Sequence, residues 1–192
     1  MFAEFETYIK EKAELSDAAI KLISSAATSK TLRKGQVLLQ QGEICRCKIF
    51  ILNGLLRAYR TKEDGSEHVM QFSPESSWTT EPESYNNLTP SSYTIDALEN
   101  SEVILWTKRD FDNLFEQIPE LRIYSEKLIF NNLNLSRQRI FNAISLTTEE
   151  KYDDFIRTHP SILARVPLHM VASYLGISVK TLSRIRHAQL KR

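Results

Sequence analysis

The sequence lacks several features that mark whole classes of protein. No run of about 18 apolar residues occurs, which excludes a conventional membrane-spanning helix. The first residues, MFAEFETYIKEKAEL, lack the basic start and apolar block of a secretory signal. We therefore expect a soluble cytoplasmic protein with no membrane partner. Its 42% hydrophobic and 26% charged residues are typical of a chain that buries a sizeable core.

Cysteine is scarce, and the two cysteines present, Cys45 and Cys47, are one residue apart. That spacing gives poor disulfide geometry, and a zinc or iron–sulfur site needs about four ligands. We predict reduced thiols and no metal site. A redox role, or a metal shared across a dimer, remains an open alternative.

The patterns of catalytic sites are missing as well. There are no paired carboxylates in a recognisable frame, no Gly-rich phosphate loop, no nucleophile elbow and no His–Glu metal spacing. The four histidines are scattered along the chain. We predict that the protein is not an enzyme and carries no cofactor.

Acidic residues are absent from the C-terminal segment. Residues 161–192 contain six basic side chains and no Asp or Glu, although the whole chain has a net charge of +1. The other 160 residues hold 19 basic and 24 acidic side chains, a net charge of −5. Since ordinary solvated surfaces mix both signs, this segment predicts a partner of opposite charge.

The pattern of apolar residues divides the chain into three parts. Helical spacing over residues 2–27, with a cap expected at Ser16-Asp17, is followed by short strand-like runs. The turn residues between these runs, such as Asn53-Gly54 and Asp64-Gly65, indicate an antiparallel β-roll. Thr147 and Glu150 have the spacing of a capping box at the start of a later helix. Residues 73–92 read as a long loop within the roll, and a long helix begins at Pro119. We predict an α+β protein with a sensor roll (1–118), a dimerisation helix (119–145) and a DNA-binding domain (146–192).

One face of the long helix carries an apolar stripe with near-heptad spacing, which predicts a seam between two copies of the chain. Packing against the chain's own core is the alternative. The residues predicted at the dimer interface are Leu121, Tyr124, Leu128, Asn132 and Leu135.

The last helical stretch has the pattern of a helix-turn-helix. Two short helices, about 167–175 and 178–190, flank Gly176, which can end a helix in the left-handed conformation, and Ser178, which can cap the next one. Arg184 suits a bidentate guanine contact, whereas Arg186, Lys191 and Arg192 suit phosphates. The predicted DNA-binding residues are Ser178, Val179, Lys180, Thr181, Ser183, Arg184, Arg186 and His187.

This order of parts resembles the Crp/Fnr family of bacterial transcription regulators. The resemblance rests on KGQVLLQQGE (34–43), IFILNG (49–54), the long helix and ASYLGISVKTLSRI (172–185), and it spans nearly the whole chain. It implies a cyclic-nucleotide-binding-type roll, a winged helix-turn-helix and a homodimer on palindromic double-stranded DNA, with RNA polymerase as a further candidate partner. The sequence ends soon after the second short helix, so we expect no wing beyond that helix. Residues 162–166 are a candidate strand for half of one before it.

The part that resembles an effector site departs from the family pattern. Nucleotide binders offer a Gly-Glu pair and then an Arg-Ser pair, which align here with Thr80-Glu81 and Ser91-Ser92. Without the arginine a buried phosphate would be unpaired, so we expect that neither cAMP nor cGMP binds tightly. A different small-molecule effector is possible. The predicted pocket residues are Phe72, Trp78, Thr80, Glu81, Tyr85, Ser91, Ser92 and Tyr93.

These observations favour a homodimeric, sequence-specific DNA-binding transcription regulator. The family's iron–sulfur sensors need a cysteine cluster, and its haem sensors need an axial ligand, for which His68 is the lone candidate. The alternative function is a small-molecule-binding or scaffold protein of the same fold that does not bind DNA.

Overall fold

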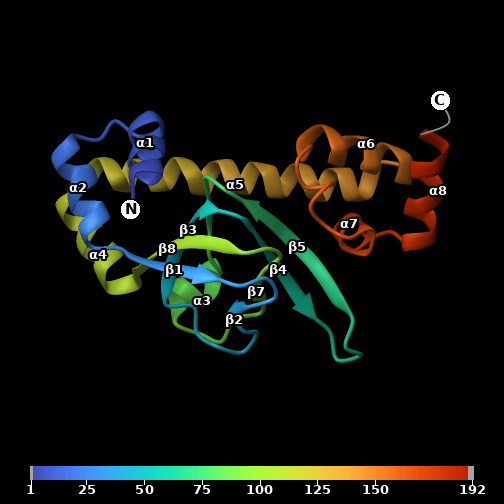
Figure 1. Ribbon diagram of the computed structural model, residues 1–192, viewed down its shortest axis with the longest axis horizontal. Helices are drawn as coiled ribbons and strands as arrows, with labels where there is room; N and C mark the ends of the chain where they lie inside the picture. The colour runs from blue at the N-terminus through green and yellow to red at the C-terminus, as the bar shows by residue number, and fades with distance from the viewer. Residues whose placement is uncertain (1, 190–192) are drawn as a thin grey trace.

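The computed structural model describes residues 2–189, and its parts are arranged along one long helix, α5 (Pro119–Ser145). Helices α1 (Ala3–Lys12), α2 (Asp17–Ser25) and α4 (Lys108–Gln117) lie at one end of α5, and the β-roll lies beside its middle (Figure 1). Helices α6 (Thr148–Thr158), α7 (Leu168–Leu175) and α8 (Val179–Gln189) lie at the other end. Among residues 2–189, no helix is both long enough and apolar enough to cross a membrane.

The predicted antiparallel roll is confirmed and consists of two four-stranded sheets. The first has the order β1-β8-β3-β6 and the second β2-β7-β4-β5. Aliphatic side chains such as Ile51, Leu56 and Val103 fill the space between them. The strands are β1 (Thr28–Leu32), β2 (Val37–Leu39), β3 (Cys47–Asn53), β4 (Leu55–Thr61), β5 (Glu67–Pro74), β6 (Ser77–Thr79), β7 (Thr94–Ala97) and β8 (Ser101–Thr107).

The segment 73–92 is not the unstructured loop that its composition predicted. It contains β6, which pairs with β3, and a short helix, α3 (Pro82–Asn87). Pro82 stands in the first turn of α3, where its missing amide hydrogen costs nothing. The segment therefore belongs to the roll and is held by its hydrogen bonds.

A helical layer covers the outer face of the first sheet. It comprises α1 (Ala3–Lys12), α2 (Asp17–Ser25), α4 (Lys108–Gln117) and the first turns of α5. Ser16 caps α2 through the amide of Ala19, as its position between two helical patterns predicted. Aromatic rings dominate the core beneath this layer, with Phe5 against Phe50 and Trp106.

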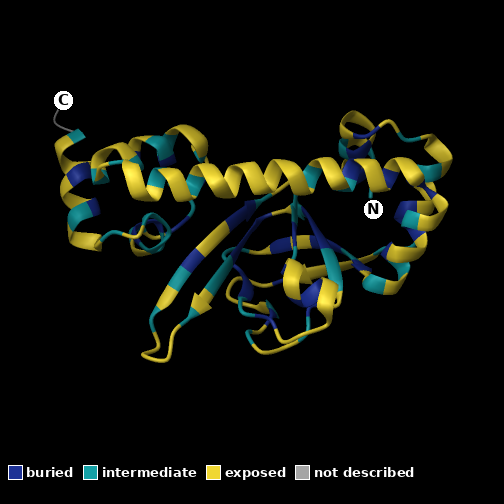
Figure 2. Cartoon of the chain, turned by 180° about the vertical axis from the view of Figure 1, so that it is seen from behind, coloured by how far each residue is buried: buried dark blue, intermediate teal, exposed yellow. Residues whose placement is uncertain are grey.

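Most of α5 is exposed along its length (Figure 2). Its buried residues are Leu121 and Tyr124, both in the first turns. Helix packing inside the chain therefore covers the start of α5 and leaves the remainder open.

The C-terminal helical unit comprises residues 146–189, with helices α6 (Thr148–Thr158), α7 (Leu168–Leu175) and α8 (Val179–Gln189). Thr147 and Glu150 form the predicted capping box at the start of α6. The predicted strand at 162–166 is wrong: residues 160–165 form turns, in which the amides of Arg165 and Val166 both donate to the carbonyl of Ile162.

The C-terminal helical unit packs against the outer face of the second sheet. Phe72 and Val69 of β5 share an apolar core with Phe155 of α6 and Val171 of α7. The hydroxyl of Ser173 accepts a hydrogen bond from the backbone amide of Val69 and donates one to the carbonyl of Glu67. The domains expected at 1–118 and 146–192 therefore share one hydrophobic core over their described residues.

Candidate functional site

The turn between α7 and α8 has the geometry that its sequence predicted. Gly176 ends α7 with φ +67°, and Ser178 accepts the amide of Thr181 at 3.1 Å. Leu182 and Ile185 of α8 are buried in the shared core, so the opposite side of α8 must face outward.

The outward side of α8 collects most of the predicted DNA-binding residues. Thr181 is half-buried, with its hydroxyl 2.8 Å from that of Ser178, and the others are exposed. Lys191 and Arg192 lie outside the described residues. The exposed members of the set are Ser178, Val179, Lys180, Ser183, Arg184, Arg186 and His187.

One basic residue of the C-terminal segment points away from this surface. The guanidinium of Arg165 lies between Glu75 and Glu99 of the roll, 3.0 Å from Glu75 Oε2 and hydrogen-bonded to Glu99 Oε1. The hydrogen bond to Glu99 and the charge of Glu75 raise the pKa of Arg165 despite its partial burial. This positive charge is neutralised inside the chain and is not available to an outside partner.

The aromatic residues Phe72, Trp78 and Tyr85, predicted to line an effector pocket, lie in three different parts of the hydrophobic core. Phe72 lies in the core under the C-terminal helical unit, 5.4 Å from the Tyr174 ring between centroids. Trp78 packs instead under α1 and donates its indole N–H to the Tyr124 hydroxyl at 3.2 Å. The sequence could not separate the two, because both are aromatic residues near the same loop.

The polar members of the predicted pocket are bound to nearby backbone groups. Glu81 is buried, and its carboxylate accepts the amides of Glu83 and Ser84 at the start of α3. Thr80 donates to the carbonyl of Cys47, and the buried Ser91 donates to the carbonyl of Tyr93. Ser92 and Tyr93 are half-buried beside them.

The carboxylate of Glu81 therefore occupies the amide groups at the start of α3. A helix start is where an incoming phosphate would find its amide donors. The resemblance to nucleotide binders aligns Glu81 with a ribose-binding glutamate, but here its oxygens cap a helix of its own chain. This placement strengthens the expectation that a cyclic phosphate is not held.

Tyr85 is buried between two lysines. The ammonium groups of Lys48 and Lys108 lie 5.0 and 4.9 Å from its ring centroid. Within residues 2–189 its hydroxyl has no hydrogen-bond partner. Burial raises the pKa of this hydroxyl, and the nearby carboxylate of Asp112 raises it further, so the phenol stays neutral.

The sequence analysis overlooked Arg57, a buried cation in the roll. Its guanidinium lies 2.7 Å from Asp96 and 2.9 Å from Glu67, and it stacks on the Tyr59 ring. Burial alone would lower the pKa of Arg57, but the two carboxylates outweigh burial and raise it. Because both partners are acidic side chains of the chain itself, Arg57 is already neutralised and does not replace the missing phosphate-binding arginine.

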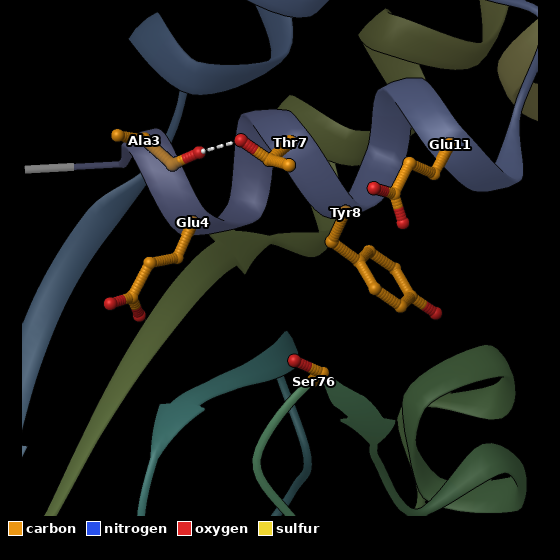
Figure 3. Close-up of a pocket in the computed structure, with 6 residues that line it drawn as sticks. All are labelled: Ala3, Glu4, Thr7, Tyr8, Glu11 and Ser76. Atoms are coloured by element: carbon orange, nitrogen blue, oxygen red, sulfur yellow. Dashed lines mark hydrogen bonds between the residues drawn. The ribbon is translucent and has the colours of Figure 1, made fainter.

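The structure has a cavity of about 410 Å³ between α1 and the β5–β6 turn. Figure 3 shows Glu4, Tyr8 and Glu11 of α1 on one side and Ser76 on the other. A second, of about 210 Å³, is lined in part by Cys45 and Cys47. Neither cavity includes a residue of the predicted effector set.

The two cysteines are free thiols. Burial raises the pKa of the Cys47 thiol, and the neighbouring Cys45 raises it further, which disfavours the reactive thiolate. Among residues 2–189, no group of three or more His, Cys, Asp or Glu side chains is placed to hold a metal ion. His68 lies with its Nε2 3.2 Å from the Ser66 hydroxyl.

Part of the apolar stripe predicted on α5 is buried, and a second line of apolar residues on the helix is exposed. Leu121 and Tyr124 are buried in the chain's own core, and Leu128 packs against that core, so these three do not form an exposed seam. Asn132 and Leu135 are exposed as expected. Another set of large apolar residues on α5 is exposed, and neighbouring members of the set are three, four or seven residues apart. These residues are Ile123, Phe130, Leu133, Ile140 and Ile144.

Comparison with known proteins places this geometry in a recognised structural class. Residues 29–118 match the family model of the cyclic nucleotide-binding domain. No curated protein sequence matches the chain. The chain therefore contains a roll of the cyclic-nucleotide-binding type, which agrees with the order of its strands and with the short helix α3.

Solved structures extend the similarity beyond the roll. FixK2 of Bradyrhizobium japonicum superposes with a TM-score of 0.75 at 16% identity, covering 86% of this chain and 84% of that one. A CooA mutant from Carboxydothermus hydrogenoformans gives 0.73 at 15% identity, with 95% and 83% covered. A candidate crp/fnr-family regulator from Eubacterium rectale gives 0.72 at 17%, with 96% and 88% covered. The chain therefore has the fold of the Crp/Fnr regulators.

Proposed function

We propose that the protein is a homodimeric, sequence-specific regulator of transcription that binds double-stranded DNA through α8. The observation that carries this proposal is the outward face of α8, where Lys180, Arg184 and Arg186 are exposed on a helix with a capped start. A helix with exposed basic side chains fits the major groove, where Arg184 reads guanine and Arg186 meets phosphate. Helix α6 carries Glu149, whose pKa is lowered by hydrogen bonds from its own backbone amide and from the Thr148 hydroxyl. The positive charge of Arg184 lowers the pKa of Glu149 further.

The exposed line on α5 supports the dimer. Ile123, Phe130 and Ile144 are separated by seven residues or by twice seven and share the first apolar core position of a heptad. Leu133 and Ile140 share its second apolar core position, three residues after the first. Such spacing is that of a two-helix coiled coil, in which apolar residues of each helix fit between those of the other. A parallel pair places both α8 helices at the same end, with half-sites about 34 Å apart.

Arg137 completes the heptad line as its one basic member, between Phe130 and Ile144. A polar residue at a core position of a coiled coil costs stability but fixes the register and orientation of the two helices. The seam we propose therefore holds two copies in a single register, which a fixed half-site spacing requires.

The sensor role of the roll has the least support in the structure, because the polar groups that would bind a nucleotide are already engaged within the chain. Glu81 is used as a helix cap and Arg57 is paired with two carboxylates, so we expect the roll to bind neither cAMP nor cGMP tightly. An effector of another kind and a contact with RNA polymerase remain predictions of the sequence.

Selection of genomic fragments on the purified protein, followed by gel shifts at graded salt, tests the function. We expect enrichment of a palindromic site and a binding constant that falls steeply with salt, because phosphate contacts release counterions. The competing function is a scaffold or small-molecule-binding protein of this fold. It is favoured if no fragment is enriched and no shift occurs even at low salt.

A further inference from the structure

Arg139 lies on α5 at the point where three parts of the chain meet. Its guanidinium donates to the carbonyls of Met70 and Val69 on β5 and to the carbonyl of Tyr174 on α7, the last at 3.1 Å. The same guanidinium stacks on the Tyr174 ring, 3.9 Å from its centroid. One side chain therefore joins the long helix, the sensor roll and the first helix of the α7–α8 pair.

The contact with α7 is made at the end of that helix. The last carbonyls of a helix have no partner within it, and Gly176 and Ile177 supply amides to the carbonyls of Ala172 and Ser173. Arg139 supplies the donor for the next carbonyl, that of Tyr174. A cation at this place also interacts favourably with the helix dipole. Arg139 thus holds α7 directly before the turn that leads into α8.

The chemistry of the site requires an arginine. Its acceptors are three backbone carbonyls that lie in different directions, and a planar fork with five N–H groups reaches them while stacking on a ring. A lysine would keep the charge, but it has neither the fork nor the flat face. Because the three carbonyls are neutral, the guanidinium binds them through the geometry of its hydrogen bonds and does not form an ion pair with them.

Arg139 is also adjacent in sequence to the proposed dimer seam, because Ile140 is one of its exposed residues. The seam fixes one α5 against the other, and Arg139 fixes the end of α7 against α5. On the other side, Arg165 ties the turn before α7 to Glu75 and Glu99 of the roll. Arg165 and Ser173 therefore tie the α7–α8 pair to the roll, and only Arg139 ties it directly to the dimer helix among the hydrogen bonds of residues 2–189.

We propose that Arg139 is a positioning residue that sets the separation of the two α8 helices in the dimer, and thereby the half-site spacing that the protein accepts. This inference rests on the proposed function, since it concerns the same DNA-binding surface. Arg139 does not touch DNA in this scheme. It acts through α7, whose end fixes the direction of α8.

The test compares wild-type protein with Arg139→Lys on the full-length chain. The probes are duplexes that carry the palindrome recovered by selection, with the half-site separation changed by single base pairs. We expect wild type to prefer one separation. In Arg139→Lys we expect the affinity ratio between the best separation and its neighbours to fall by about tenfold, because α8 is no longer held at one place. The matched control is Arg157→Lys, since Arg157 is an exposed arginine on α6 that pairs with Asp154 of the same helix.

A purely stabilising role would lower the affinity for all duplexes equally, and an unchanged spacing preference in Arg139→Lys overturns the proposal. Hydrogen exchange without DNA supplies a second measurement. We expect faster exchange in residues 168–175 and 179–189 of Arg139→Lys, with unchanged exchange in the first sheet and an unchanged dimer. If wild type binds no duplex at all, the proposed function fails while this measurement still applies, and unchanged exchange in α7 overturns the role of Arg139.

Discussion

In the roll, the side chains that align with a nucleotide-binding cassette are bound to their own backbone, whereas in the C-terminal helical unit the polar side chains of α8 project outward. Glu81 caps α3 and Ser91 bonds to its own loop, while Lys180 and Arg184 contact no acidic side chain among the ion pairs of residues 2–189. Both regions keep the fold of their structural relatives. The difference shows that a fold can retain the frame of a binding site while the groups that would bind are engaged elsewhere.

The largest effect is expected from a charge placed in the proposed seam. Phe130→Glu puts two carboxylates opposite each other between the α5 helices, and we expect the dimer dissociation constant to rise by about a thousandfold, measured by analytical ultracentrifugation. Leu135→Glu is the control, because Leu135 is as exposed as Phe130, at 67% against 65%, but lies off the heptad line. Equal loss of the dimer in both variants would contradict the assigned face.

The next effect concerns the frame of the roll. Gly54 has φ +100°, and a Cβ there would lie 2.7 Å from the backbone of Ser101. We expect Gly54→Ala to lower the free energy of unfolding by about 3 kcal/mol, measured by urea denaturation. Gly65 has a similar φ of +81° with open space around it, so Gly65→Ala should cost only about 1 kcal/mol. A Gly54 variant as stable as the Gly65 variant would refute this account of the close approach.

Arg184→Ala tests the outward face of α8. Loss of a bidentate base contact should weaken specific binding by about 2 kcal/mol for each half-site and relax the sequence preference, while sparing the dimer. Arg186→Ala should instead weaken binding to all sequences and reduce the salt dependence, as expected for a phosphate contact. Unchanged footprints in Arg184→Ala would overturn its assignment as the base-reading residue.

A smaller effect of pH is expected where the two regions meet. His159 stacks on Phe155, and burial lowers its pKa below the usual 6.5, with Arg139 lowering it further and Asp154 opposing. The folded state thus disfavours the protonated ring, so its contribution to stability is complete above about pH 6.5 and is lost as the pH falls through the lower folded-state pKa. We expect the urea concentration at the midpoint of unfolding to decrease as the pH is lowered from about 7.5 to about 5.5. His159→Gln should show less of this decline, and an identical decline would exclude His159 as its source.

No measurable effect is expected from the nucleotides themselves. Titration calorimetry of the wild-type protein with cAMP or cGMP should give no saturable heat at micromolar concentrations, because Glu81 already occupies the amides at the start of α3 and Arg57 is paired with two carboxylates. Micromolar binding of either nucleotide would show that Arg57 or another cation leaves its partners to reach the ligand. That result would remove the contrast between the two regions.

Local patterns predicted the parts whose geometry is local. The Thr147–Glu150 capping box, the Ser16 cap and the Gly176–Ser178 turn each depend on neighbours within a few residues, and each is present. The turns at Gly54 and Gly65 likewise mark the ends of the strands that they predicted. The content of segment 73–92 was missed, because three-residue strands such as β6 have too few residues to show a period.

The long helix shows the limit of periodicity. Helix α5 carries apolar residues on more than one face, and the sequence favoured the face of Leu121, Tyr124 and Leu128 as the seam. The structure buries the first two in the chain's own core and exposes the line through Phe130 and Ile144. Spacing alone marks that a face is apolar, but which apolar face meets the roll depends on packing against residues far away in the sequence.

The sequence by itself determined the class of fold, the order of its parts, the cap and turn around α8, and the excess of positive charge at the C-terminal end. These features follow from local hydrogen bonds, periodicity and composition, which need no distant partner. Only the tertiary structure decided that Arg165 is neutralised by the roll, that Glu81 caps α3, that Arg57 is paired, and that Arg139 joins α5, β5 and α7. Each of these depends on which distant groups the fold brings within a few ångströms of a charge, and a charge that is already paired is no longer available for a ligand.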